Sequence, residues 1–404
     1  MLPTLIFTVF LDSLGFGLVF PIFSSLIVHE GVFFSTESSL ALRGLILGLL
    51  ISSYCLGQFF GGPILGAMSD RKGRKKILMM TLWIASFGYL LSGVGILIKS
   101  LLLLFVARIL NGIAAGNYAI AQSVIADTSK EKEKSKNFAL LAMAWGTGFV
   151  VGPYLGGKLT LLGYTAPFLL SAFLCMLNLV LVLWKLKETR DLFAFLIQKK
   201  VSVFAGMQHL KKALQLSEFR AIFLVMFVFS LGWGFFTEFS PIFLNGYFEL
   251  NVEQIGNSYA WLGLWIALSQ GFFIRPLLKK YASETLLSIA LFCLALVLLC
   301  LLLLEDSTNL VWMIPLIAFS VAFISPSAAT IVSNLSAEES QGKMLGIYNS
   351  VQQAAIGISP LFSGSLVALY PHLPITVGGV CMFFAFLLLI WDLWKKKFFI
   401  SEEL

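Results

Sequence analysis

The sequence predicts an all-α integral membrane protein with twelve transmembrane helices in two pseudo-symmetric bundles of six. Of its 404 residues, 58% are hydrophobic and 12% are charged, whereas a soluble domain carries roughly 25% charged residues. The apolar residues gather in twelve runs, each close to the ~20 residues that a helix needs to cross a bilayer. The runs cover residues 3–28, 41–67, 77–98, 101–126, 137–161, 165–184, 219–247, 255–278, 284–304, 309–333, 344–369 and 374–394.

The first run, residues 3–28, is interpreted as a membrane span and not as a signal peptide. It is longer than the apolar core of about 7–15 residues that a signal peptide has, and it contains Asp12. If both termini are cytoplasmic, nearly all of the 28 Lys and Arg residues fall on the cytoplasmic side. By the positive-inside rule this distribution predicts a multi-pass protein of the inner membrane with both termini in the cytoplasm. The exceptions are Arg43, Lys99, Arg108 and Lys158.

The two halves of the chain repeat each other. Ser13-Leu-Gly-Phe-Gly17 recurs as Ser230-Leu-Gly-Trp-Gly234, and Gly152-Pro153 in the fifth run corresponds to Ser359-Pro360 in the eleventh. Such a repeat of six spans predicts two bundles in the same orientation with a substrate site between them. We expect bundles at residues 1–185 and 219–404, joined by a cytoplasmic linker, 186–218, that contains an amphipathic helix.

The loop between the second and third runs places five cations and one acid within seven residues, starting at Asp70. Positive-inside charges would explain the cations, but neither Asp70 nor the glycines. We expect Gly66 and Gly73 to permit a close helix approach and a tight turn. Asp70 can accept hydrogen bonds from Arg71, from Arg74 or from a helix N-terminus. The sequence therefore predicts a cytoplasmic gating loop.

Span 5 carries small residues at helical spacing. Gly148, Gly152 and Gly156 lie four residues apart and form a seam that lets a neighbouring backbone approach. Pro153 removes a backbone donor and can kink the helix, and Gly157 follows the seam directly. Close helix packing is the expected structure of this segment.

Three ionisable residues within the apolar runs are candidates for proton coupling. Asp12 lies about nine residues, or roughly 13 Å, into its span. A carboxylate at this depth is costly unless it faces water or a partner, so we expect it to bind a proton or a substrate cation, with a structural hydrogen bond as the alternative. A cation at Arg108 would favour the ionised form of a nearby carboxyl and so release its proton; the alternative is a static salt bridge. Glu238 either shares proton binding or reaches the outer interface.

Polar and aromatic residues are candidates for a substrate cavity. The polar residues of span 4 share one helical face with Arg108 and should line that cavity; a similar stripe follows span 11. These stripes and the isolated candidates comprise Asn111, Tyr118, Gln122, Asn349, Gln352, Tyr54, Gln58, Trp233 and Gln270.

These motifs resemble the major facilitator superfamily, within its twelve-span drug/proton antiporters, and most closely the tetracycline/proton antiporters. The gating loop matches the pattern G-x-L-x-D-R-x-G-R-K with Met68 in place of Leu, Arg108 and Gly112 match Arg-x-x-x-Gly, and span 5 matches G-x-x-x-G-P-x-x-G-G. The resemblance implies that the gating loop holds an outward-open state and that the span 5 motif favours exchange over leak.

We therefore expect a proton-coupled exporter of a small amphipathic compound, such as a tetracycline-like drug. It would need no cofactor because the proton gradient supplies the energy, and its partners would be substrate, protons and lipid. We expect a monomer that binds no nucleic acid. An uptake transporter for a metabolite, a sugar or a siderophore-like chelate is the alternative. An enzyme is disfavoured because the chain has no H-E-x-x-H, G-x-S-x-G or G-x-x-x-x-G-K-[ST] pattern.

Overall fold

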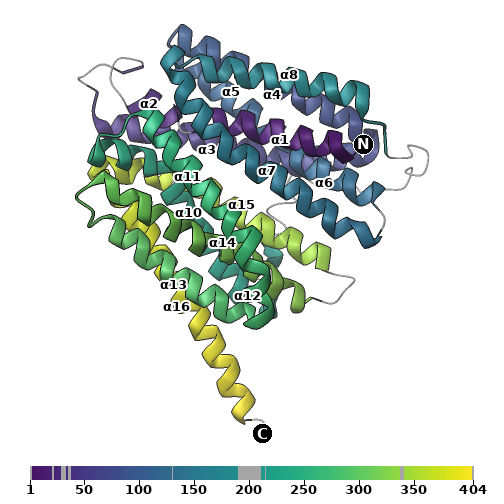
Figure 1. Cartoon of the computed structure of the whole chain (residues 1–404), viewed down its shortest axis with the longest axis vertical. Helices are drawn as coiled ribbons and strands as arrows, with labels where there is room; N and C mark the ends of the chain where they lie inside the picture. Colours follow the sequence, from purple (N-terminus) through teal and green to yellow (C-terminus); the bar gives the residue numbers. More distant parts are fainter. Residues whose placement is uncertain are drawn as a thin grey trace. The chain divides into compact units, whose positions relative to one another are not determined.

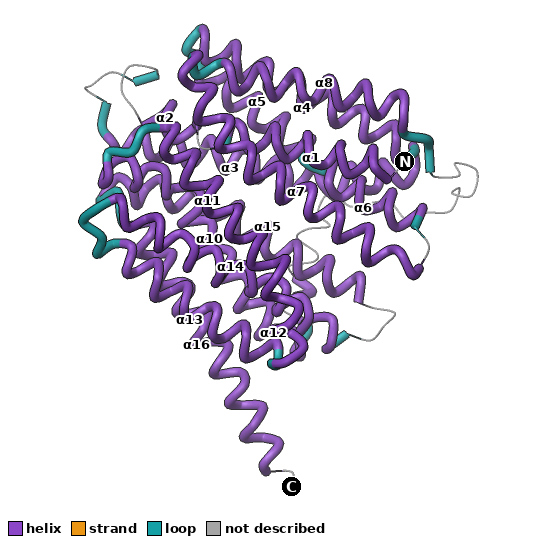
Figure 2. The backbone as a smooth tube through the Cα atoms, viewed as in Figure 1, coloured by secondary structure: helices purple, strands orange, loops and turns teal. Residues whose placement is uncertain are grey.

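The computed structural model describes residues 2–20, 22–28, 33–34, 38–129, 131–189, 211–213, 215–336 and 341–402. These residues form helices joined by short loops, and none of them forms a strand (Figure 2). The predicted all-α class is confirmed. The amphipathic helix expected in the linker falls largely on residues 190–210, which lie outside the described residues.

The chain forms two compact units. Unit 1 comprises Met1–Ala205 and Glu249–Gly263, and unit 2 comprises Gly206–Phe248 and Leu264–Leu404. The helices of unit 1 are α1 (Leu2–Val19), α2 (Ile22–Val28), α3 (Leu40–Lys72), α4 (Arg74–Leu97), α5 (Leu101–Ala114), α6 (Asn117–Thr128), α7 (Glu131–Leu159), η1 (Thr160–Leu162), α8 (Ala166–Lys185) and the first part of α11 (Val252–Leu268). Those of unit 2 are α10 (Ser217–Phe248), the end of α11, the π-helical segment η3 (Ser269–Phe273), α12 (Ile274–Lys280), α13 (Ser283–Leu301), η4 (Ser307–Asn309), α14 (Leu310–Asn334), α15 (Gln341–Leu369) and α16 (Leu373–Glu402).

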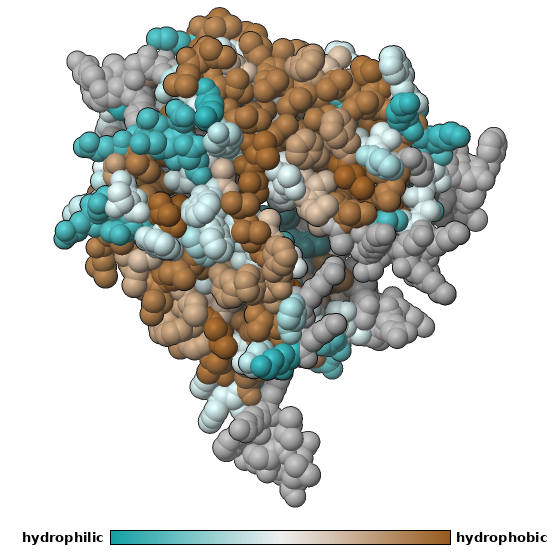
Figure 3. Space-filling model, viewed as in Figure 1, coloured by the Kyte–Doolittle hydropathy of each residue, from teal (hydrophilic) through white to brown (hydrophobic). Residues whose placement is uncertain are grey.

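In unit 1, α1 is the central helix and packs against α6, α7 and α8 (Figure 1). Its buried side chains include Leu5, Val9 and Leu18. The outer side of α8 instead exposes Phe173 and Trp184, and hydrophobic surface covers this helix in Figure 3. A helix with apolar residues on both its buried and its exposed sides is typical of a membrane bundle, where lipid covers the outer side.

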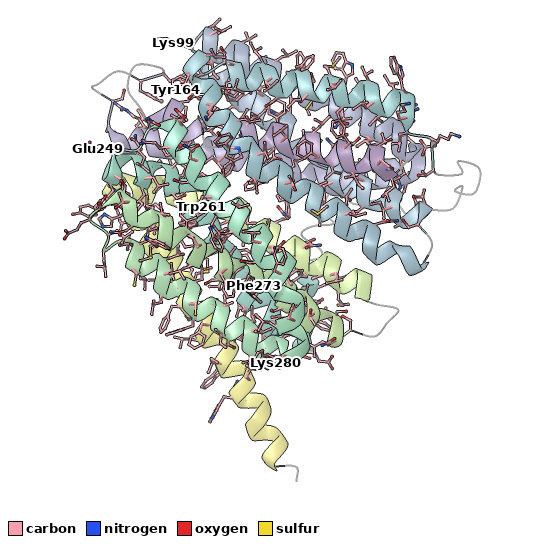
Figure 4. The ribbon with its side chains drawn as sticks, viewed as in Figure 1. Lys99, Tyr164, Glu249, Trp261, Phe273 and Lys280 are labelled. Atoms are coloured by element: carbon pink, nitrogen blue, oxygen red, sulfur yellow. The ribbon has the colours of Figure 1, made fainter. Side chains whose placement is uncertain are left out.

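Tight turns connect consecutive spans at the ends of unit 1. Lys99, in the turn between α4 and α5, has a positive φ of 54°. Tyr164, in the turn before α8, lies at the same end of the unit (Figure 4). Gly73, with φ 97°, joins α3 to α4. A positive φ strains most residues but not glycine, so Gly73 adopts its turn conformation with less backbone strain than Lys99 does.

Backbone contacts repeat between the two units as the sequence repeat predicts. In unit 1, α1 packs on α7, and a Cβ at Gly17 would lie 3.0 Å from Gly152 Cα. In unit 2, α10 packs on α15, where the corresponding Gly234 faces Ser359. Both pairs join positions that the sequence comparison had aligned. The duplication therefore extends to individual helix contacts.

Among the residues that the structure describes, ten helical segments are long and apolar enough to cross a membrane. Relative to the twelve predicted runs, residues 255–278 and 344–369 are missing from this set. The first is divided among α11, η3 and α12, so no single α-helix spans it. The second is the single helix α15, whose apolar character is diluted by polar residues such as Asn349 and Gln352.

The contact between α1 and α7 predicts that a glycine-to-alanine substitution destabilises the protein at Gly152 of α7 but not at Gly146 of the same helix. A Cβ at Gly152 would lie 2.6 Å from Gly17 Cα and 2.9 Å from Leu14 O, whereas a Cβ at Gly146 would meet no atom within 4 Å. Overpacking typically costs about 1–3 kcal/mol, so Gly152→Ala should lower the thermal unfolding temperature of the purified protein. Gly146→Ala should leave it unchanged or raise it, because alanine favours helix. Equal unfolding temperatures for the two variants would contradict this packing.

Candidate functional site

Asp12 is a half-buried carboxylate within the apolar helix α1. Its Oδ1 accepts a hydrogen bond from Asn117 Nδ2 of α6 at 2.9 Å. The Oδ1 of Asn117 accepts in turn from the hydroxyl of Thr81 in α4. Both Thr81 and Asn117 are buried. A chain of three polar groups on three helices therefore holds the carboxylate in place.

Sequence reasoning identified Asp12 but neither of its supporting residues. Thr81 and Asn117 stand in apolar runs without a motif around them, and the predicted polar stripe contains the neighbouring Tyr118 instead of Asn117. The available signal was the amide itself, because an uncharged polar side chain within a span must find a partner.

The fourth predicted run corresponds to one candidate span, Leu101–Thr128, which a short turn interrupts. α5 ends at Ala114 and α6 begins at Asn117, and in the intervening turn Ala115 N donates to Gly112 O at 3.1 Å. Asn117, which directly follows this turn, hydrogen-bonds Asp12 of α1. On α6, Tyr118 and Gln122 are half-buried and hydrogen-bonded to each other.

Arg108 of α5 lies between two aromatic rings. Its guanidinium carbon is 4.6 Å from the ring centre of Phe23 and 4.5 Å from that of Tyr54. The side chain is 5% exposed. Cation–π contacts are worth about 2 kcal/mol when desolvated, so the rings offset part of the cost of burying this charge. Among the described residues, Arg108 and Asp12 do not form an ion pair.

An aromatic row lies beside Asp12 in unit 1. Phe16, one helical turn from Asp12, contacts Phe149 at 6.2 Å and Tyr54 at 5.4 Å between ring centres. Phe149 stacks on Trp145 at 5.5 Å with an interplanar angle of 5°, and Trp145 contacts Tyr118 at 6.2 Å. Within this row Trp145 is exposed and the other rings are half-buried. The row offers ring faces to a flat apolar molecule.

The predicted cavity residues divide between the two units. In unit 1, Asn111 is buried and Gln58 is half-buried, one turn after Tyr54 on α3. In unit 2, Trp233 lies between Phe229 and Phe236 on α10, at 6.5 and 5.3 Å. The remaining candidates of unit 2 are half-buried Glu238 and Gln352, and exposed Gln270 and Asn349.

The span 5 motif forms two close contacts. On one side, a Cβ at Gly148 would lie 2.6 Å from Phe10 O of α1, and Gly156 faces Leu18. On the other, a Cβ at Gly157 would lie 2.9 Å from Val252 O at the start of α11. Pro153 lies within α7 between these contacts, and its carbonyl faces Gly256 of α11. The motif thus packs α7 against two helices at once.

Arg74 is the centre of the predicted gating loop. Its guanidinium pairs with Asp70 at 2.6 Å and with Asp127 of α6 at 3.1 Å, and it donates to Ser69 Oγ at 2.7 Å. Although it is a cation near the end of a span, its side chain is only 7% exposed. Hydrogen bonds between charged groups are stronger than neutral ones. The network therefore fixes the ends of α3, α4 and α6 together.

The two glycines of the gating loop have different surroundings. Within the described part of unit 1, a Cβ at Gly66 would meet no atom within 4 Å, so the close helix approach expected there stays a prediction. The tight turn expected at Gly73 is present, with φ 97°. Arg71 is exposed, whereas Arg74 three residues later is buried, so the two arginines of the motif have different environments.

Glu188, which sequence reasoning missed, caps the helix that follows this loop. Its carboxylate accepts from the backbone amides of Arg74 at 2.8 Å and Lys75 at 3.2 Å, across more than a hundred residues. Gly73 precedes α4 and has no side chain to cap it. A carboxylate at a helix N-terminus satisfies unpaired amides and favourably meets the helix dipole. The segment after α8 is thereby attached to the gating loop.

A model of the Major Facilitator Superfamily matches residues 5–360 of the chain. The chain belongs to this superfamily. It is 31% identical to the class C tetracycline resistance protein of Escherichia coli over 280 aligned residues. The aligned region covers 69% of this chain and 67% of that protein. It is 26% identical to the quinolone resistance protein NorA of Staphylococcus aureus over 380 aligned residues, and this region covers 92% of this chain and 91% of NorA.

Solved structures of major facilitator proteins share the fold. A D-xylose–proton symporter matches with a TM-score of 0.73 at 17% identity, over 96% of each chain. A human organic anion transporter matches with a TM-score of 0.68 at 21% identity, over 96% of this chain and 98% of the other. Together with the superfamily match, these likenesses establish a multi-span transporter with the twelve-helix major facilitator fold.

The capping role of Glu188 predicts a loss of stability when its carboxylate is removed. Glu188→Ala should lower the thermal unfolding temperature, because loss of a helix cap costs about 1 kcal/mol. Limited proteolysis at the turn around Gly73 should become faster. Lys187→Ala, a neighbouring exposed substitution, is the control and should leave both measurements unchanged. Equal behaviour of the two variants would show that the cap contributes nothing.

Proposed function

We propose that this transporter exports a small amphipathic compound, with tetracycline as the first to test, in exchange for protons across the inner membrane. Both termini would lie in the cytoplasm, because the cationic loops concentrate on their side. The observation that carries the proposal is the placement of Asp12, a half-buried carboxylate in an apolar span that is held by Asn117. Ionisable groups within membrane spans are rare and mark ion pathways.

The surroundings of Asp12 support exchange of a proton for an amphipathic molecule. The aromatic row of Phe16, Phe149 and Trp145 begins one turn from the carboxylate. A ligand that stacks there would bring its polar groups to Asp12, so that substrate and proton compete for one site. The names of the tetracycline and quinolone resistance proteins favour export of such a compound.

In the proposed cycle, Asp12 takes up a proton while the site faces outward, and the substrate leaves. The site then opens inward, the proton is lost to the cytoplasm and the substrate binds again. Arg108 favours the ionised carboxylate at this step because it is a fixed positive charge. Glu238 in unit 2 is a candidate second proton site. No cofactor takes part, and one chain is sufficient.

The gating loop would couple this cycle to the cytoplasmic side. The pairs of Arg74 with Asp70 and Asp127 join three helix ends, and Glu188 adds the segment after α8. Networks of this kind have discrete arrangements, so they favour two-state opening over gradual deformation. We propose that the loop holds the outward-open state.

Everted vesicles test the proposal. In vesicles acidified inside by respiration, tetracycline should dissipate part of the pH gradient when the wild-type protein is present, because each molecule pumped inward releases protons outward. Asp12→Asn should abolish this response. Asp306→Asn is the matched control, since exposed Asp306 caps Thr308 in a loop and asparagine can keep that cap.

Two outcomes would contradict the proposal. A tetracycline response that survives in Asp12→Asn would remove Asp12 from the coupling step. No response to a panel of amphipathic drugs, combined with pH-driven accumulation of a sugar or chelate by intact cells, would show uptake instead of export.

A further inference from the structure

Two buried polar atoms at the contact between α1 and α8 have no hydrogen-bond partner within the described residues. They are Thr8 Oγ1 on α1 and Asn178 Oδ1 on α8, and their residues are 1% and 0% exposed. The two residues touch each other, because Asn178 Nδ2 donates to Thr8 O at 3.0 Å. An unpaired buried polar atom is unfavourable and rare. Two of them on residues in direct contact indicate a small polar ligand between them.

The two unpaired atoms lie one helical turn from Asp12, toward the N-terminus of α1. Thr4, Thr8 and Asp12 follow one another at intervals of four residues, so they share one side of the helix. Side chains of a helix lean toward its N-terminus, which directs the Asp12 carboxylate back over Thr8. The rise between these two residues is about 6 Å. Two hydrogen bonds of about 2.8 Å through one water molecule match that distance.

Hydrogen bonds before and after Asp12 hold α1 and α8 in register. One turn before Asp12, the Asn178 amide donates to Thr8 O. Three residues after Asp12, Ser171 Oγ donates to Gly15 O at 2.9 Å. Asp12 itself is held from a third helix by Asn117. The carboxylate and the two unpaired atoms therefore belong to one restrained cluster, in which a ligand would have a defined place.

We propose that Thr8 and Asn178 bind a water molecule that carries the Asp12 proton toward the cytoplasm. A buried water makes about three hydrogen bonds, and three polar groups are available: the Thr8 hydroxyl, the Asn178 carbonyl oxygen and the Asp12 carboxyl. An amide oxygen only accepts, whereas a hydroxyl donates or accepts by rotation of its hydrogen. These groups therefore satisfy the water whether Asp12 is protonated or ionised.

One shift of protons converts the protonated arrangement into the ionised one. While Asp12 is protonated, its carboxyl donates to the water, and the water donates to Asn178 Oδ1 and Thr8 Oγ1. The carboxyl proton then passes to the water, a water proton passes to Thr8 Oγ1, and the former hydroxyl proton of Thr8 passes to solvent water at half-buried Thr4. Afterwards Thr8 donates to the bound water, which donates to Asn178 and to the ionised carboxylate. The bound water and the hydroxyl are regenerated, and one hydronium ion leaves.

Infrared difference spectroscopy of the purified full-length protein in lipid nanodiscs tests the water site without a transport substrate. Spectra with Asp12 protonated and ionised are subtracted, in ordinary water and in water labelled with heavy oxygen. A bound water that changes its hydrogen bonds with Asp12 gives O–H stretching bands that move in labelled water. We expect such bands in the wild type and their loss in Asp12→Asn and in Thr8→Val. Their absence from the wild type, or their persistence in Thr8→Val, would overturn the inference.

Two further threonine variants serve as controls. Thr8→Val removes the hydroxyl but keeps the backbone oxygen that Asn178 bonds, so it preserves the contact between α1 and α8. Thr8→Ser keeps the hydroxyl and should restore the bands. Thr330→Val makes the same change in α14, where the hydroxyl donates to Pro326 O of its own helix at 2.8 Å, and should leave the bands unchanged.

Thermal unfolding distinguishes a hydroxyl that bonds a water from one that is unpaired. Replacing an unpaired buried hydroxyl by a methyl group removes an unfavourable group and should raise the unfolding temperature. If the Thr8 hydroxyl bonds a water shared with Asn178, its removal takes away one partner of that water. The unfolding temperature of Thr8→Val should then be equal to or lower than that of the wild type, and a higher one would contradict the site.

Everted vesicles test the relay. Positioned proton-transfer groups contribute roughly 100-fold or more to rates, so tetracycline-dependent proton release should slow by about tenfold or more in Thr8→Val. Thr8→Ser should retain the wild-type rate, and both variants should bind tetracycline as the wild type does. Equal rates in Thr8→Val and the wild type would overturn the relay. The inference rests on the proposed function only for release toward the cytoplasm. A wild type without a tetracycline response would overturn that function, while the bands in labelled water still decide the water site.

Discussion

The position of the candidate site depends on the backbone contact between α1 and α7. At Gly148, Gly152 and Gly156 of α7 the backbone of α1 occupies the space that side chains would fill. The two helices therefore approach more closely than larger residues allow. This approach places the Trp145 carbonyl within 2.6 Å of Ser13 Oγ. It thereby sets Asp12 beside the aromatic row, and the same contact recurs in unit 2 between Gly234 and Ser359.

The buried polar groups are stabilised in different ways that match their roles. Arg108 keeps its charge between two rings, where cation–π contacts partly replace water. Arg74 is compensated by two carboxylates, which makes it a fixed structural junction. Asp12 receives one neutral donor from Asn117. A carboxylate that accepts from a neutral amide can exist with or without its proton, which is what an exchange site requires.

The sequence was sufficient for features that local composition and spacing determine. Hydropathy predicted a membrane protein, and the recurrence of Gly17 as Gly234 predicted the duplication. The depth of Asp12 within its span identified it as the leading candidate for the site. Features that depend on contacts between distant segments were not predictable. Glu188 caps α4 from 114 residues away, and the hydrogen bond of Asn117 to Asp12 joins residues that are 105 positions apart.

Proton release on substrate binding tests the central claim most directly, because it requires neither a membrane potential nor turnover. Tetracycline is added to the purified protein in a weakly buffered solution near the pH at which Asp12 is half protonated, and the change in pH is measured together with binding. The account predicts protons released in proportion to tetracycline bound by the wild type, and binding without release by Asp12→Asn. Saturable binding to the wild type with no proton released would contradict competition of substrate and proton for Asp12.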